Sequence, residues 1–157
     1  MSEFAGKVVM VTGCARARGI GRAIAVAFAR AGADIVVTDV AAGGTRNENE
    51  EGLEEIRLGW KGLDSLAEEI KGLGRRVLTL VGNVSRATDA ERFVADALAQ
   101  FGHIDVLVNN AAAPHGADRR LVWEIPEEAW DLVIYVNLKG TFLMCRAVIP
   151  HMLERGS

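Results

Sequence analysis

The sequence has little cysteine, little net charge and no long uninterrupted apolar run. Cys14 and Cys145 are too few for a disulfide framework. A formal net charge of -3 at pH 7 argues against broad electrostatic attraction to nucleic acid or anionic lipid. The polar Ser2 and Glu3 follow Met1, where a secretory signal would carry a basic and then an apolar segment. We therefore expect a cytoplasmic, reduced protein with a small-molecule ligand and no membrane or nucleic-acid partner.

The pattern of apolar residues predicts alternating strands and helices. Half of the 157 residues are apolar and a quarter are charged, which is enough for one globular domain over 1–157 with its own core. Apolar stripes at helical spacing separate short β-rich runs, so we expect an α/β, doubly wound parallel sheet of the Rossmann type. The usual strand order of such sheets, three-two-one-four, would place the fourth strand at an edge. The runs are apolar almost throughout, as in strands buried on both faces, and they lie at 7–11, 34–38, 77–81 and 104–108.

Two further segments complete the predicted outline. An amphipathic stretch from about Pro126 to Glu154 predicts one long helix after the fourth strand. The segment 40–62 is rich in Gly, Asn and Glu without strong periodicity, and it predicts a surface excursion that is partly helical at 53–58. Within that excursion, Trp60 is interpreted as a local packing anchor.

A glycine-rich stretch, TGCARARGIGRAIA, follows the first predicted strand and opens the first helix. Gly13, Gly19 and Gly21 permit positive φ angles and close approach of the backbone, while a helix N-terminus offers free amides to a pyrophosphate. Asp39 ends the second strand, where a carboxylate can accept hydrogen bonds from an adenosine ribose and would repel a 2′-phosphate. These features favour NAD(H) over NADP(H), although Arg16 or Arg18 could reach a phosphate.

Taken together, these motifs make the sequence resemble the short-chain dehydrogenase/reductase family. The matches are TGCARARGIG, Asp39, GNVS at 82–85, NNAA at 109–112 and VNLKG at 136–140, and they cover the chain from about Gly6 to Met152. The resemblance implies an oxidoreductase that uses NAD(H) to move hydride between nicotinamide and a carbonyl or alcohol substrate.

The resemblance also implies roles for individual residues. Asn137 matches the family's active-site asparagine, whose backbone helps to hold a water in a proton relay, and Asn109 would tie strands together. The implied cofactor contacts are Gly13, Gly19, Ile20 and Gly21 with the pyrophosphate, Asp39 with the ribose, Asn83 and Val84 with the adenine, and Asn110, Ala111 and Ala112 beside the cofactor.

The sequence departs from the family's pattern at three places. Five residues, 14–18, separate the first two glycines of the motif, where the family usually has three. Asn83 replaces the usual aspartate, and Ala112 replaces the usual glycine. The phosphate loop is therefore expected to be longer than usual.

The pentapeptide YVNLK contains the chain's single tyrosine and matches the spacing of a catalytic Tyr-x-x-x-Lys pair. Successive helix residues lie about 100° apart, so Tyr135 and Lys139 share a face while Asn137 points about 200° away. If Asn137 faces the active site, the other two face elsewhere. The family's own pair lies on a later helix, so we expect this chain by itself to be catalytically incomplete and the sheet to be incomplete on its C-terminal side.

Several alternatives and secondary expectations remain open. A non-catalytic NAD(H)-binding module is the main alternative, and another Rossmann-type protein such as a methyltransferase is a third. No histidine has a partner at metal-ligand spacing, so no metal site is expected, although His115 could belong to the cleft loop. An exposed fourth strand and a helix without neighbours predict a homo-oligomer.

Overall fold

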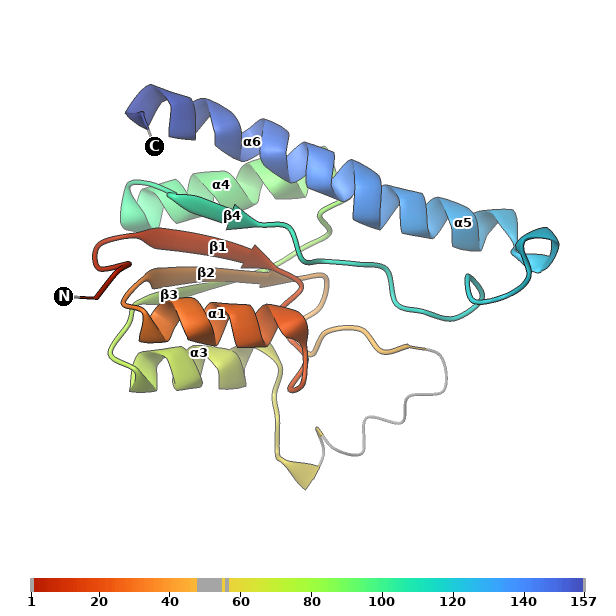
Figure 1. Ribbon diagram of the computed structural model, residues 1–157, viewed down its shortest axis with the longest axis horizontal. Coiled ribbons are helices and arrows are strands. Elements are labelled where there is room, and N and C mark those ends of the chain that lie inside the picture. The colour runs from red at the N-terminus through yellow and green to blue at the C-terminus, as the bar shows by residue number, and fades with distance from the viewer. Residues whose placement is uncertain (1, 48–54, 56, 157) are drawn as a thin grey trace.

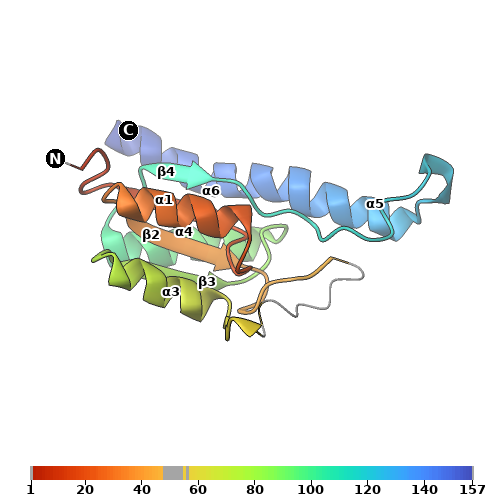
Figure 2. The same ribbon diagram turned by 60° about the horizontal axis from the view of Figure 1, so that its bottom comes forward.

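The computed structural model describes residues 2–47, 55 and 57–156. Within these residues, parallel strands form one sheet in the order β3-β2-β1-β4, which confirms the predicted order. Helices α1 and α3 lie on one face of the sheet and α4 and α6 on the other (Figures 1 and 2). The elements are β1 (Val8–Thr12), α1 (Ile20–Arg30), β2 (Asp34–Asp39), α3 (Leu63–Gly72), β3 (Val77–Val81), α4 (Ala87–Phe101), β4 (Val106–Val108), a 3-10 turn (Val122–Glu124), α5 (Glu127–Val133), a π-helix (Ile134–Lys139) and α6 (Gly140–Arg155).

The alternation of side chains along β1 divides the core into two parts. Val9 and Val11 pack beneath α1 and α3, whereas Val8 and Met10 pack beneath α4 and α6. All of β1 and the centre of β2 are buried, as predicted for strands covered on both faces. The same prediction is wrong for β3 and β4, which are largely only half-buried, because each has a neighbouring strand on one side only within the described sheet.

The last helical segment is less regular than predicted. Its boundaries agree closely with the expected 126–154, but the π-helix Ile134–Lys139 interrupts it between α5 and α6. A Cβ atom on Gly140 would lie 2.8 Å from Val84 Cγ2, so the glycine lets α6 approach the turn after β3 closely. The π-helix could not be predicted from the sequence, because its hydrogen-bond pattern depends on how this segment packs against the rest of the fold.

The run Glu127–Arg155 is long and apolar enough to cross a membrane by length and composition alone, with a mean hydropathy of 1.5 in its most apolar window. Long helices of soluble proteins meet the same criterion. The expected absence of a membrane partner therefore stays a prediction.

The excursion between β2 and α3 is closed at its neck. Leu63 N–H donates a 2.9 Å hydrogen bond to Ala42 O, and Gly62 has the positive φ angle (66°) that this approach requires. Trp60 is half-buried and packs against the α1–α3 core, which confirms it as a local anchor. Most of the predicted helical stretch 53–58 lies outside the described residues, although Glu55 and Arg57 are helical.

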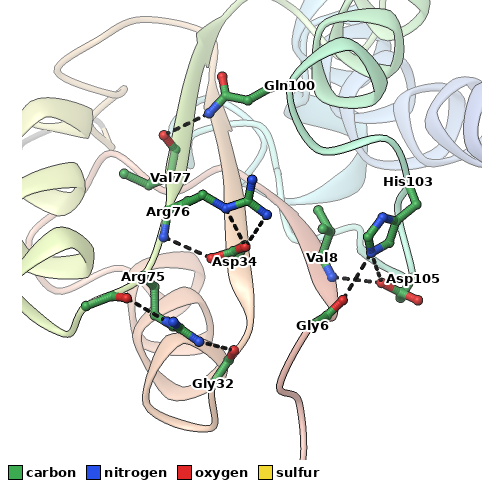
Figure 3. A network of polar contacts seen from close by, with 11 residues as sticks. Gly6, Val8, Gly32, Asp34, Arg75, Arg76, Val77, Gln100, His103 and Asp105 are labelled. Atoms are coloured by element: carbon green, nitrogen blue, oxygen red, sulfur yellow. Dashed lines mark hydrogen bonds and ion pairs between the residues drawn. The ribbon is translucent and has the colours of Figure 1, made fainter.

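At the amino ends of the strands, two carboxylates join neighbouring strands (Figure 3). Asp34 on β2 accepts hydrogen bonds from Arg76 N–H at 2.9 Å and from Arg76 Nε at 2.8 Å, just before β3. Asp105, just before β4, accepts from Val8 N–H at 2.8 Å and from Lys7 Nζ at 3.0 Å, at the start of β1. We call Asp34 and Asp105 the clamp carboxylates.

Candidate functional site

A cavity of about 400 Å³ opens at the carboxyl ends of the strands, opposite the clamp carboxylates. The strand ends, the start of α1 and the loop after β4 enclose it, and Leu132 and Val136 contribute from the helices that follow. Most predicted cofactor residues lie in its wall: Gly13, Arg16, Gly19, Ile20, Asp39, Asn83, Val84, Asn110, Ala111 and Ala112.

The glycine turn is built by close packing as well as by backbone freedom. Gly13 has φ 73°, and a Cβ there would lie 2.7 Å from Ala111 Cα. Gly21 does not line the cavity, because it is buried under the turn, where a Cβ would lie 2.6 Å from Asn110 Nδ2. Gly19 precedes α1 and caps it with no side-chain hydrogen bond, so the first-turn amides of α1 are available to an anion.

The five-residue phosphate loop 14–18 folds inward. Cys14 and Ala15 are buried in the α1–α3 core and Ala17 is also buried, while Arg18 is exposed and outside the cavity wall. Burial, and then the neighbouring Asp39 carboxylate, raise the pKa of the Cys14 thiol, which keeps it protonated. The longer loop therefore contributes both to the core, through Cys14 and Ala15, and to the cavity wall, through Arg16.

Asp39 lies at the carboxyl end of β2 with both oxygens engaged by backbone amides. Oδ2 accepts from Ala15 N–H at 2.8 Å and Oδ1 accepts from Val40 N–H at 2.8 Å. Burial raises the pKa of Asp39, and these N–H donors offset part of that rise because they favour the charged form. The carboxylate is thus fixed in orientation at the cavity wall.

Asn110 ties the turn after β1 to the end of β4. Its Nδ2 donates to Thr12 O and to Gly13 O, both at 2.9 Å. The strand-tying role expected for Asn109 is therefore wrong, since Asn109 Nδ2 donates to Cys145 Sγ of α6 at 3.4 Å. The side chains of these two adjacent asparagines point in different directions, because the backbone turns as it leaves β4.

Asn83 shapes the turn after β3. Its Oδ1 accepts from Ser85 N–H at 2.9 Å and from Ser85 Oγ at 2.8 Å, so the amide oxygen is already used within the turn. Asp89 of α4 accepts from Asn83 N–H at 2.9 Å, and this bond is the main reason that the pKa of Asp89 is lowered. Any adenine contact at this position therefore falls to atoms other than Asn83 Oδ1 and N–H.

Within the π-helix, the side chain of Asn137 has different contacts from those of Tyr135 and Lys139. Asn137 Oδ1 accepts from Ala113 N–H at 2.9 Å and so holds the loop after β4, although Asn137 is not in the cavity wall. Tyr135 is 49% exposed, with Lys139 Nζ 5.2 Å from its ring centroid. The prediction that Tyr135 and Lys139 share a face away from Asn137 is confirmed.

His115 follows Pro114 of the cavity wall and lies at the rim. Its N–H donates to Asn47 Oδ1 at 2.8 Å, and its Nδ1 lies 3.4 Å from Asp118 Oδ2. The histidine is not itself in the wall, and the role suggested for it in the cleft loop stays a prediction. Among residues 2–47, 55 and 57–156, no group of three or more His, Cys, Asp or Glu side chains could hold a metal ion.

Sequence reasoning missed several residues that shape the site. Thr12 Oγ1 accepts from the N–H groups of Asn110 and Ala111, at 3.1 and 3.0 Å, and its place directly before the first glycine was the available signal. The other missed residues carry no motif and are brought to the wall by the fold: Thr38, Val40, Thr45, Gly82, Ala113, Pro114, Leu132 and Val136.

Comparisons with known proteins agree with this geometry. The family model for short chain dehydrogenases matches residues 7–157. The 3-oxoacyl-(acyl-carrier-protein) reductase of Thermotoga maritima is 37% identical over 150 residues, which are 96% of this chain and 52% of that protein. The chain thus spans about half the length of the curated relatives it matches.

Solved structures show the same fold. Carveol dehydrogenase from Mycobacterium avium in complex with NAD superposes with a TM-score of 0.81 at 30% identity, over 99% of this chain and 53% of that one. A metagenomic short-chain oxidoreductase in complex with NADP gives a TM-score of 0.75 at 30% identity, over 97% and 59%. The methyltransferase alternative finds no support among these matches, and the chain belongs to the short-chain dehydrogenase family.

Proposed function

We propose that this chain is a dinucleotide-binding domain that serves an NAD(H)-dependent oxidoreductase, in which hydride passes between nicotinamide and a carbonyl or alcohol substrate. One observation carries the proposal: the uncapped N-terminus of α1, the Asp39 carboxylate and the loop after β4 meet around a single cavity at the carboxyl ends of the strands. In open α/β sheets, ligands bind at this end.

The pyrophosphate would lie against the turn from Gly13 to Ile20. The turn has no Cβ atoms at Gly13 and Gly19, and the amides of α1 and the partial positive charge of its N-terminus would meet the anion. Ile20 is 73% exposed at the mouth of the cavity and supplies apolar surface to cover. Arg16 in the wall adds a positive charge.

Asp39 would accept hydrogen bonds from the adenosine ribose hydroxyls. Oδ2 accepts from Ala15 N–H and Oδ1 from Val40 N–H, and a carboxylate oxygen can accept more than one hydrogen bond. A 2′-phosphate would meet the negative charge of Asp39, so NAD(H) is preferred. Similar proteins have been solved with NAD and with NADP. The preference for NAD(H) therefore depends on whether the negative charge of Asp39 outweighs the positive charges of Arg16 and Arg18 at a 2′-phosphate.

The remaining predicted contacts follow the shape of the wall. Val84 and the turn at Asn83 would face the adenine, while Asn110, Ala111 and Ala112 would lie beside the nicotinamide half. The bound nicotinamide supplies the hydride chemistry. Asn137 holds Ala113 in place and would help to order a proton relay near the ring.

The chain by itself is expected to bind the cofactor and to turn nothing over. Tyr135, the single tyrosine, is exposed beside Lys139 and is not in the cavity wall. We expect no general acid or base role for it on a substrate in that cavity, because proton transfer needs hydrogen-bond reach. This orientation also favours the second candidate function, a non-catalytic NAD(H)-binding module.

Isothermal titration with NADH and with NADPH tests the proposal. We expect NADH to bind more tightly, and Asp39→Ala to weaken NADH about tenfold to a hundredfold because hydrogen bonds to a charged group are lost. Asp64→Asn, on the exposed start of α3, is the control and should leave affinity unchanged. Failure of NADH to bind, or equal binding by Asp39→Ala, would contradict the proposal. The intact mass of the protein from its native gene, against 16.9 kDa, separates the enzyme from the module.

A further inference from the structure

The extended phosphate loop is held at Ala15 from two sides. Ala15 N–H donates to Asp39 Oδ2 at 2.8 Å, and Ala15 O accepts from the indole Nε1 of Trp60 at 2.7 Å. Ala15 has no exposed surface, so neither bond has water as a ready substitute. Both backbone groups of Ala15 are therefore held, one by Trp60 and the other by the carboxylate in the cavity wall.

Trp60 is itself fixed by α1. The Arg22 guanidinium lies 5.0 Å from the centroid of the Trp60 ring. Arg22 also donates two 2.9 Å hydrogen bonds to Glu69 of α3, and its Nη1 donates to Ala17 O at 3.0 Å. Arg22 thus contacts both Trp60 and the phosphate loop, and it limits the movement of one relative to the other.

Residues near the closed base of the 40–62 excursion also lie close to the phosphate loop. Gly44 has φ 76°, and a Cβ on it would lie 3.1 Å from Ala15 Cβ. The Leu63–Ala42 hydrogen bond closes the neck, so Gly44 and Trp60 approach Ala15 together although they are far apart along the chain. A loop with two more residues than the family usually has would lose more conformational entropy on binding, and these contacts remove that freedom in advance.

We propose that Trp60 is a positioning residue for the cofactor site, which orients Asp39 and the phosphate loop through Ala15. This inference rests on the proposed dinucleotide binding. Trp60 is outside the cavity wall, so its effect on affinity would pass through Ala15 and not through contact with the ligand.

The first test is Trp60→Phe, which keeps an aromatic ring under Arg22 and removes only the indole N–H. We expect NADH to bind about three- to tenfold more weakly in isothermal titration, as for the loss of one buried hydrogen bond. Trp123→Phe is the matched control, since Trp123 is 77% exposed, and it should leave NADH affinity unchanged. If the wild-type chain binds NADH and Trp60→Phe binds it equally well, the inference is overturned while the proposed function stands. If the wild type does not bind NADH, the proposed function itself fails.

A double-mutant cycle separates positioning from a merely structural role. If Trp60 acts through Asp39, Trp60→Phe should have little further effect on NADH affinity in an Asp39→Ala background, because the carboxylate to be oriented is gone. Additive losses in the cycle would overturn the route through Asp39. Thermal unfolding of each ligand-free variant confirms that it is folded before titration.

Discussion

Two threonines side by side in the sheet differ in what their hydroxyls do. Thr12 and Thr38 are register partners in β1 and β2, and both are almost fully buried. Thr12 Oγ1 accepts two amide hydrogen bonds from the loop after β4. Thr38 Oγ1 has no hydrogen-bond partner within the described residues. The same side chain is therefore stabilising at one position and costs free energy at the other.

Replacing each threonine with valine, which has nearly the same shape, should give opposite results. Thr12→Val leaves the amides of Asn110 and Ala111 without their acceptor and should lower the free energy of unfolding by about 1–3 kcal/mol. Thr38→Val removes an unpaired hydroxyl and should leave that free energy unchanged or raise it. Urea unfolding of both variants measures the difference, and equal losses in the two variants would contradict this expectation.

Residue types alone predicted much of the site, but not the direction of each side chain. The glycines, Asp39 and the NNAA stretch were identifiable because their chemistry and order match a nucleotide site. Asn109 and Asn110 are chemically identical neighbours, and only the path of the backbone after β4 gives the tying role to Asn110. Val136 and Leu132 reach the wall through helix packing, which leaves no local pattern in the sequence.

Among the elements, β4 is the least secured strand. It pairs with β1 over three residues, and the described sheet has no strand on its other side. Asp105 adds to this short ladder by holding Val8 N–H and Lys7, while Arg155 Nη2 of the last helix lies 3.8 Å from its Oδ1 (Figure 3 shows the Val8 and His103 contacts). The carboxylate side chain is only 4% exposed, so its partners are poorly replaced by water.

The stability supplied by Asp105 should depend on pH. Burial would raise the pKa of Asp105, but the hydrogen bonds from Val8 and Lys7 outweigh it, so the pKa is lowered in the folded chain. A lowered folded pKa means stability that is present above the unfolded value of about 4 and lost as pH falls through the folded value. Asp105→Asn should therefore lose about 1–3 kcal/mol at neutral pH, and the difference from wild type should shrink below about pH 4.

Urea unfolding from about pH 7 to about pH 3 follows this difference. Asp96→Asn is the control, because Asp96 is 45% exposed and its contact with Arg92 is 3.7 Å long. We expect a change within about 0.5 kcal/mol for it at every pH. A constant Asp105→Asn effect down to the lowest pH would contradict the argument.

The order of strands and helices could be predicted from the sequence, whereas the irregular π-helical turn within the last helical run could not. Apolar runs located the strands to within two residues, and the amphipathic stretch located the ends of the last helical run to within one. The π-helix was missed because Ile134–Lys139 has ordinary helix-forming residues, and the close approach at Gly140 and the hydrogen bond from Asn137 to Ala113 are tertiary facts.

Over the whole molecule, the unmatched apolar surface lies along the last helical run. We call Tyr135, Leu138, Phe142, Ile149 and Leu153 the exposed stripe, because they recur at three- to seven-residue intervals and are each 46% exposed or more. Together with the open side of β4 in the described sheet, this stripe offers apolar side chains and unpaired backbone for contact with another chain.

We expect the chain to self-associate through this surface. Sedimentation velocity should show dimers or larger species, and Phe142→Asp should shift the distribution toward monomer because a charge would be buried in the contact. Leu73→Glu is the control, since Leu73 is exposed directly after α3, across the sheet, and it should change nothing. A monodisperse wild-type monomer would contradict the expectation.

The cavity and the clamp carboxylates occupy opposite ends of the same strands. A library of substitutions restricted to the clamp end, at positions such as Arg75, Arg76 and His103, would therefore change melting temperature without touching the ligand-binding surface. Thermostabilisation and cofactor engineering could proceed in parallel on one scaffold, with the gains combined afterwards, because the two sets of positions share no direct contact.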